Sequence, residues 1–242
     1  MADLAQVAQA VAVAAQGPPS GLLDRLCAAC VSAMAVEGAA ISVMAEVNRP
    51  MASSVSDSRV SRFEELQFTL GEGPAVAAFR ACAPAFVEDL LAPVGSWPVF
   101  AAEAAAVASD TGWPIRSVLA LPLQLGSAQP LGVLDLYKRE SGAPDAALLK
   151  LARVAVDTVA MALYSATLAA SEEGEELGWL QYAVGSRVDV DQAVGMVMAQ
   201  ADLASEGALA RIRAYAFLHG QNMDEVARAV IARELRFTEE PR

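Results

Sequence analysis

Histidine and cysteine are scarce in this sequence, which has one histidine, His219, and three cysteines, Cys27, Cys30 and Cys82. An odd number of cysteines without a repeated spacing argues against a disulfide framework and favours a reducing, cytoplasmic setting. Two cysteines and a distant histidine do not supply the four ligands of a zinc site, and no second histidine is available for a triad. The sequence therefore predicts no catalytic residues, no metal site and no cofactor.

Long apolar runs are also absent, although hydrophobic residues make up 55% of the chain. The excess is mostly alanine, and no run reaches the roughly eighteen strongly apolar residues that indicate a transmembrane helix. The apolar stretch from Leu4 to Ala15 is short, lacks a basic flank and is followed by Gly17-Pro18-Pro19. It is more typical of a helix than of a signal peptide, so we expect a protein without membrane contact.

Basic residues are outnumbered, with 17 Lys and Arg against 29 Asp and Glu and a formal net charge of -12. Such a charge repels phosphate backbones on average. Any nucleic-acid contact would have to use a local basic face.

The length of 242 residues predicts two domains. Apolar spacing predicts a helix over 20–36, with Ser20 as its N-cap. Short β-rich runs over 39–47 and 51–56 predict a hairpin. A second pair of such runs, over 116–125 and 130–138, predicts a second hairpin. Between them we expect an irregular stretch over 57–73, a short helix over 75–82, an edge strand over 84–88 and a helix over 98–109. This order predicts an α+β fold with one mixed or antiparallel sheet.

From residue 145 onward the chain is predicted to be mostly helical. A long amphipathic helix over 145–170 leads to an acidic, glycine-containing linker over 171–178. Apolar stripes then predict three short helices in a bundle, beginning near Val188, Ala208 and Met223, with Ser205 as an N-cap and His219 in a solvated loop. The expected domains are an N-terminal helix and linker over 1–19, an α+β domain over 20–170, the linker, a helical domain over 179–237 and a tail over 238–242.

Four segments of the first domain are distinctive, namely SDSRVSRFEELQFTLGEGP, PAFVEDL, SWPVFA and RSVLALPLQLG. Through them the domain resembles GAF domains, and in particular those that precede RNA-binding ANTAR domains in actinobacterial regulators. The resemblance implies a sensor domain with a small-molecule pocket, whose candidate walls are Phe68, Phe79, Trp97 and Trp113. The alternative interpretation of these aromatics is core packing.

The helical domain resembles the ANTAR domain of antitermination regulators through Gln192-Ala193-x-Gly195-Met196-x-Met198, Tyr215-Ala216 and Val226-Ala227-x-x-Val230. The resemblance implies a dimer that binds paired hairpins of a leader transcript. Some basic positions of the family are lost, since Val194 and Ala214 stand where lysine and arginine are common. The candidate RNA-binding residues are Gln192, Gly195, Arg211, Arg213, Tyr215, Arg228 and Arg233.

From Arg187 onward the chain has seven arginines against nine carboxylates. We therefore expect RNA binding to be weak or to need dimerisation, and Arg213→Ala to weaken it further. Arg228 and Arg233 could equally be solvated surface charges.

Three functional hypotheses remain open from the sequence. The first is a cytoplasmic, homodimeric antitermination regulator in which the GAF domain senses a signal or ligand and controls the RNA-binding ANTAR bundle. The second is a signalling or protein-interaction module whose degenerate ANTAR bundle no longer binds RNA. The third is an enzyme that uses a reactive cysteine such as Cys82. Cys27-x-x-Cys30 is expected to pack in a helix, and Gly71-x-Gly73 to form a bend and not a phosphate loop.

Overall fold

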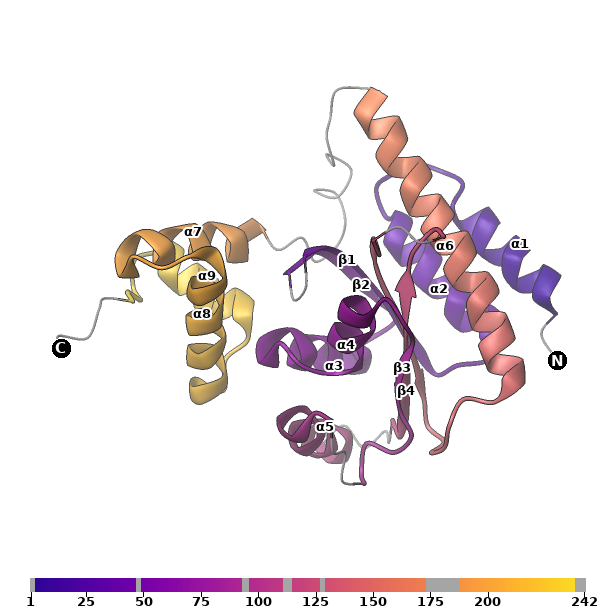
Figure 1. The fold of residues 1–242 in the computed structure, drawn as a ribbon, viewed down its shortest axis with the longest axis horizontal. Coiled ribbons are helices and arrows are strands. Elements are labelled where there is room, and N and C mark those ends of the chain that lie inside the picture. Colours follow the sequence, from indigo (N-terminus) through magenta and orange to yellow (C-terminus); the bar gives the residue numbers. More distant parts are fainter. Residues whose placement is uncertain are drawn as a thin grey trace. The chain divides into compact units, whose positions relative to one another are not determined.

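A computed structural model describes residues 3–46, 49–92, 96–110, 115–126, 129–172 and 188–237. The chain divides into two compact units, one comprising Met1–Gln67 and Glu72–Ser186 and the other Phe68–Gly71 and Arg187–Arg242. Figure 1 shows both units, which are described separately below. The predicted linker falls on the end of a helix at Ser171 and Glu172 and on residues 173–178, which lie outside the described ranges.

The first unit is built on an antiparallel sheet in the order β2-β1-β5-β4-β3. The strands are β1 (Gly38–Glu46), β2 (Arg49–Val55), β3 (Ala85–Val87), β4 (Ser117–Leu123) and β5 (Gly132–Lys138). Both predicted hairpins are confirmed, and they join through β1 and β5. The predicted edge strand is also confirmed, because β3 lies at the end of the sheet, where it pairs with β4. The fold class is therefore α+β.

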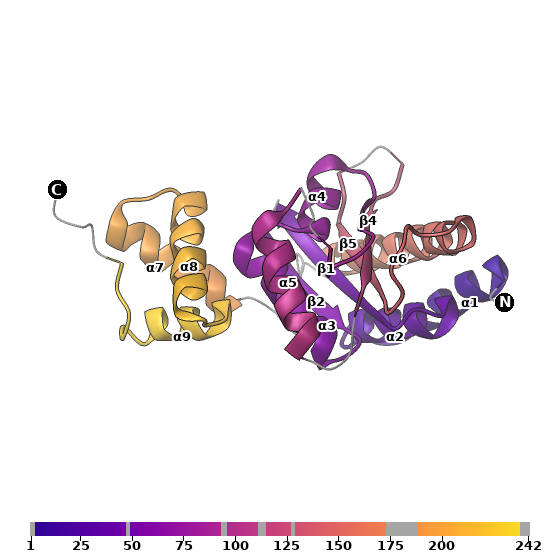
Figure 2. The ribbon, with the colours of Figure 1, turned by 90° about the horizontal axis from the view of Figure 1, so that it is seen from below.

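Helices α1 (Leu4–Ala14), α2 (Leu22–Met34) and α6 (Ala146–Glu172) cover one face of the sheet in both views (Figures 1 and 2). Their apolar sides pack against the inward residues of β1, β4 and β5 in one hydrophobic core. Val7 and Val11 of α1 are fully buried in it. The predicted cap of α2 is wrong, because Gly21 and not Ser20 occupies the N-cap, with φ 72°.

The opposite face carries α3 (Ser58–Leu70), α4 (Pro74–Ala81) and α5 (Pro98–Asp110) (Figure 1). The prediction of an irregular stretch over 57–73 is wrong, because α3 spans most of it. Its inward positions are Val60, Phe63, Glu64 and Gln67, which have helical spacing but are half polar. An apolar stripe was therefore missing from the sequence, and the helix lies on the sheet through buried polar groups as well as apolar ones.

The second unit contains, in its described residues, α7 (Val188–Ala201), α8 (Ser205–His219) and α9 (Met223–Ile231). These helices confirm the predicted bundle, with core residues Val190, Ala193, Val194, Val197, Ala208, Ile212, Ala216, Met223, Val226, Ala227 and Val230. The Asn222 side chain accepts from Glu225 N while the Glu225 side chain accepts from Asn222 N, so a capping box starts α9. The predicted N-cap Ser205 is wrong, since Ala204 holds that position.

Among the described residues, no helix is both long enough and apolar enough to cross a membrane.

Candidate functional sites

The exposed side of α7 carries two of the predicted RNA-binding residues. Gln192 and Gly195 lie on successive turns and both face solvent, while Ala193, Val194 and Val197 are buried on the other side. A Cβ atom at Gly195 would meet no atom within 4 Å. The helix backbone is therefore open at Gly195, and a ligand could approach it closely there.

The position of Val194 accounts for the loss of one basic residue that is common in ANTAR domains. Its side chain is buried in the core of the bundle beside Val190 and Val197. Valine at this position therefore adds to the apolar core of the helical unit.

Helix α8 presents Arg211 and Tyr215 on successive turns, both half-buried, with Ala208, Ile212 and Ala216 on its core side. Arg213 lies two residues from each of them and so points in another direction around the helix. The structure thus brings Arg211 and Tyr215 together but separates Arg213 from them along α8.

Tyr215 belongs to an aromatic cluster that was missing from the sequence-based predictions. Its ring stacks on His219 with centroids 3.9 Å apart and meets Phe237 edge-on at 5.6 Å. His219 Nδ1 lies 2.9 Å from Tyr215 O, and Phe237 N donates to Gln200 Oε1 at 2.8 Å. The expectation of a loop histidine is wrong, because His219 is the last residue of α8. Its i,i+4 spacing from Tyr215 was the signal that could have found the stack.

The remaining candidates, Arg228 and Arg233, are both exposed but belong to different elements. Arg228 lies on α9 and its Nε donates to Asp224 O in the preceding turn at 3.2 Å. Arg233 follows the helix, in a left-handed turn with φ 63°. They therefore do not form a basic stripe along one helix.

Five of the acidic residues of this unit lie in the first turns of its helices. Asp189 and Asp191 lie in the first turn of α7, Glu206 in that of α8, and Asp224 and Glu225 in that of α9. Carboxylates there stabilise the positive end of the helix dipole. These five of the nine carboxylates counted from Arg187 onward therefore also stabilise the helices.

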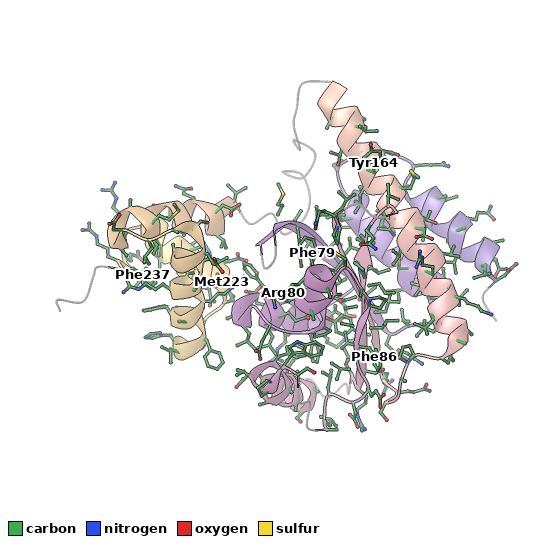
Figure 3. The ribbon with its side chains drawn as sticks, in the orientation of Figure 1. Phe79, Arg80, Phe86, Tyr164, Met223 and Phe237 are labelled. Carbon is green, nitrogen blue, oxygen red and sulfur yellow. The ribbon has the colours of Figure 1, made fainter. Side chains whose placement is uncertain are left out.

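In the sheet-containing unit, Phe79 is the predicted pocket residue that reaches the sheet. Figure 3 labels Phe79 on α4. Its side chain is buried and packs with Met44, Ala120 and Val133. Phe68 is buried on α3 but lies outside this cluster, and Trp97, just before α5, is only half-buried. Trp113 lies outside the described residues. The four aromatics are thus not gathered into one described wall.

A buried polar network lies on the same face of the sheet. Tyr137 OH donates to Glu64 Oε1. Gln67 Nε2 lies 3.4 Å from Glu64 Oε1, 3.4 Å from Tyr137 Oη and 3.5 Å from Asp135 Oδ2. Burial, the negative charge of Glu64 and a hydrogen bond with Glu64 hold the pKa of Asp135 well above its usual range. No sequence pattern predicted this network, because α3 and β5 are far apart along the chain.

A cavity of about 180 Å³ opens elsewhere, between the ends of β4 and β5 and the start of α6. None of the predicted pocket aromatics lines it. Its polar groups bond to one another, with Ser117 Oγ donating to Glu140 O at 2.8 Å and Leu148 N donating to Asp145 Oδ1 at 2.7 Å. These groups are therefore weak candidates for ligand recognition.

The cysteines fit the packing interpretation of Cys27-x-x-Cys30. Both thiols are buried in the core, where burial raises the pKa of Cys30 to about 12 and the pKa of Cys27 still further. Cys27 Sγ donates to Ala39 O at 3.0 Å. Since the thiolate is the reactive form, neither residue suits nucleophilic or redox chemistry at neutral pH. Cys82 is exposed and ends α4 in a left-handed conformation.

Comparison with known families gives two matches, a GAF domain over residues 18–163 and an ANTAR domain over residues 179–231. Similar solved structures include a GAF domain region of a putative membrane protein from Geobacter sulfurreducens, with 18% identity, a TM-score of 0.44, and coverage of 60% of this chain and 93% of that one. Another is the GAF domain of an Acinetobacter phosphoenolpyruvate-protein phosphotransferase, with 15% identity, a TM-score of 0.44, and coverage of 67% and 91%. Comparison with curated proteins gives no match.

Proposed function

Because the chain belongs to the GAF domain family and carries an ANTAR domain after its GAF domain, we propose that it is a signal-responsive, RNA-binding regulator of transcription antitermination. The observation that carries this proposal is the order of the two domains, a sensor type followed by an RNA-binding type. Both are regulatory domain types, and the proposed function needs no catalytic step. We place this activity in the cytoplasm, where transcripts are made.

The proposed RNA face consists of the open α7 surface at Gln192 and Gly195 together with Arg211 and Tyr215 of α8 and Arg228 of α9. The guanidinium groups of Arg211, which is half-buried, and Arg228, which is exposed, supply phosphate contacts, and a helix surface without a side chain at Gly195 permits a nucleic-acid backbone to approach.

The test is a fluorescence-anisotropy titration of the full chain with an RNA carrying two hairpins, and with a matched RNA carrying one, at about 50 and about 200 mM salt. We expect a specific complex with the two-hairpin RNA that weakens steeply with salt. Absence of specific binding at both salt concentrations would instead favour a protein-interaction module, to which the net acidity of the chain also points.

We further propose that the protein is a homodimer paired through α6. The side of α6 opposite the core exposes a stripe at spacings of three and four residues, namely Met161 (54% exposed), Tyr164 (44%) and Leu168 (49%). Such spacing is that of a coiled-coil seam, and a symmetric dimer uses the same patch on both copies. Pairing two chains in this way would also supply two ANTAR domains for two hairpins.

Sedimentation velocity tests the dimer. We expect the wild type to sediment as a dimer at micromolar concentration and Leu168→Glu to shift it to monomer, because two buried carboxylates would face each other in the seam. Ser61→Glu, which adds the same charge at an exposed position of α3 on the other side of the sheet, is the control. A Leu168→Glu variant that remains dimeric would rule out this stripe as the interface.

A further inference from the structure

The rings of Tyr215 and His219 form a stack at the C-terminal end of α8. Their centroids lie 3.9 Å apart, and their planes are inclined by only 19°. Tyr215 is half-buried against the core of the bundle, whereas His219 is exposed. One face of the imidazole is therefore covered by Tyr215, and its outer face remains for a ligand.

The chain that follows His219 leaves space beside this ring. Gly220 ends α8 in the left-handed conformation, with φ 61°, and it has no side chain. A Cβ atom at Gly220 would meet no atom within 4 Å. A flat group could therefore approach the end of α8 without displacing any part of the bundle.

Contacts from three segments fix the Tyr215–His219 stack before any ligand binds. His219 Nδ1 lies 2.9 Å from Tyr215 O and acts as the donor, because a carbonyl oxygen can only accept. Phe237, labelled in Figure 3, meets Tyr215 edge-on, and its backbone N donates to Gln200 Oε1 of α7. A ligand that stacks on His219 does not have to order these rings first, and Nε2 is left to bond it.

A positive group lies on the same side of α8. Arg211, Tyr215 and His219 follow one another at spacings of four residues, so they form one stripe along the helix. The guanidinium of Arg211 suits a phosphate, and the rings offer a flat face to an aromatic ligand. A phosphate joined to a flat aromatic group describes a nucleotide.

The stack selects an unpaired nucleotide. A base inside a duplex is already stacked on both of its faces, whereas a base in a loop can turn out and stack on tyrosine or histidine. Such stacking tolerates any base, because every base has a π face.

We propose that the Tyr215–His219 stack binds one unpaired base of the RNA, with the outer face of His219 as the stacking surface and Arg211 as a partner for a neighbouring phosphate. The inference rests on the proposed RNA-binding function and names the part of the RNA that this end of α8 recognises. It adds His219 to the proposed RNA face.

Stacking would supply affinity that the charge of this unit does not. From Arg187 onward the chain has seven arginines against nine carboxylates. Phosphate contacts weaken with salt because they release counterions, whereas a base stacked on a ring releases none. The contribution of His219 should therefore be the same at low and at high salt.

The first experiment observes His219 directly. It is the only histidine of the chain, so the imidazole C–H signals in the NMR spectrum of the untagged full-length protein come from this residue alone. We expect a single-stranded adenosine hexanucleotide to shift these signals upfield, because the ring current of a stacked base shields them. An abasic strand with the same number of phosphates should not. Equal shifts with both strands, or no shift with the adenosine strand, would overturn the inference.

The second experiment titrates variants with the two-hairpin RNA at about 50 and about 200 mM salt. We expect His219→Ala to weaken binding by roughly fivefold to a hundredfold at both salt concentrations. His219→Phe keeps a ring that can stack and should retain most of the affinity. Leu218→Ala, which truncates a neighbouring side chain that is 77% exposed, is the matched control and should bind as the wild type does.

Two results of this titration would contradict the stacking role. If His219→Phe binds as weakly as His219→Ala and both flatten the salt dependence, His219 contacts a phosphate and not a base. If His219→Ala binds as the wild type does, no base stacks there.

The two proposals fail separately. If the two-hairpin RNA binds but His219→Ala has no effect, the base site is wrong and the RNA-binding function stands. If the adenosine strand alone shifts the His219 signals but the two-hairpin RNA forms no specific complex, the base site stands and the antitermination function does not.

Discussion

Replacing Gly132 with alanine is expected to destabilise the GAF domain by about 3 kcal/mol or more, because the added methyl group has no space between the central strands. A Cβ atom at this position would lie 2.0 Å from the carbonyl oxygen of Ser42 on β1. That oxygen belongs to the backbone of the central β1–β5 pair, in which Val43 is the partner of Gly132. The clash therefore cannot be relieved by rotating a side chain and requires the two strands to separate.

Urea denaturation followed by circular dichroism checks this expectation, with Gly195→Ala as a control of the same chemistry. Gly195 is helical, and its new methyl group would meet nothing within 4 Å, so that variant should be stabilised by about 0.5–1 kcal/mol. If Gly132→Ala unfolds at the wild-type urea concentration, the close pairing of β1 and β5 at this point is incorrect.

The second large effect concerns RNA. Arg211→Ala combined with Arg228→Ala should weaken binding of the two-hairpin RNA by roughly tenfold to a hundredfold near physiological salt, because each arginine removed takes away a phosphate contact. The slope of log affinity against log salt should flatten by about 1.4 to 1.8. Anisotropy titrations at several salt concentrations measure both quantities.

A control with the same change in net charge separates local contact from overall electrostatics. Arg80→Ala combined with Arg153→Ala removes two exposed arginines from the GAF domain and should alter affinity only slightly. If both double variants lose affinity equally, the arginines act through the net charge of the protein and the proposed RNA face is wrong.

Most of the fold could be predicted because apolar residues recur within each element at the spacing of a helix or a strand. The two hairpins, α2, α6 and the three C-terminal helices each repeat apolar residues at strand or helix spacing, and all of them are present. Helix α3 could not be predicted in this way, since Glu64 and Gln67 take inward positions that a periodicity argument reserves for apolar side chains. Their burial depends on partners supplied by β5.

In the candidate sites, too, neighbours within one helix could be predicted, whereas contacts between distant elements could not. Gln192 and Gly195 could be placed on one surface from their spacing, because a helix determines which of its own residues are neighbours. The Glu64–Asp135 pair could not, because it joins two elements far apart in sequence, and neither carboxylate carries a local signal. Phe237 was missed for a related reason, since it follows the last helix and returns to Tyr215 through tertiary packing.

Helix α1 precedes the matched GAF segment, yet Val7 and Val11 are buried in the same core as α6. The smallest fragment that keeps this domain intact therefore begins at Asp3 or before, and trimming to residue 18 would leave a bare apolar strip along α2 and α6. Helix α6, the last helix of the GAF domain, thus packs against α1, the first helix of the chain. A probe attached near Leu4 would consequently lie on a helix that packs against α6, and it would be far in sequence from the ANTAR helices.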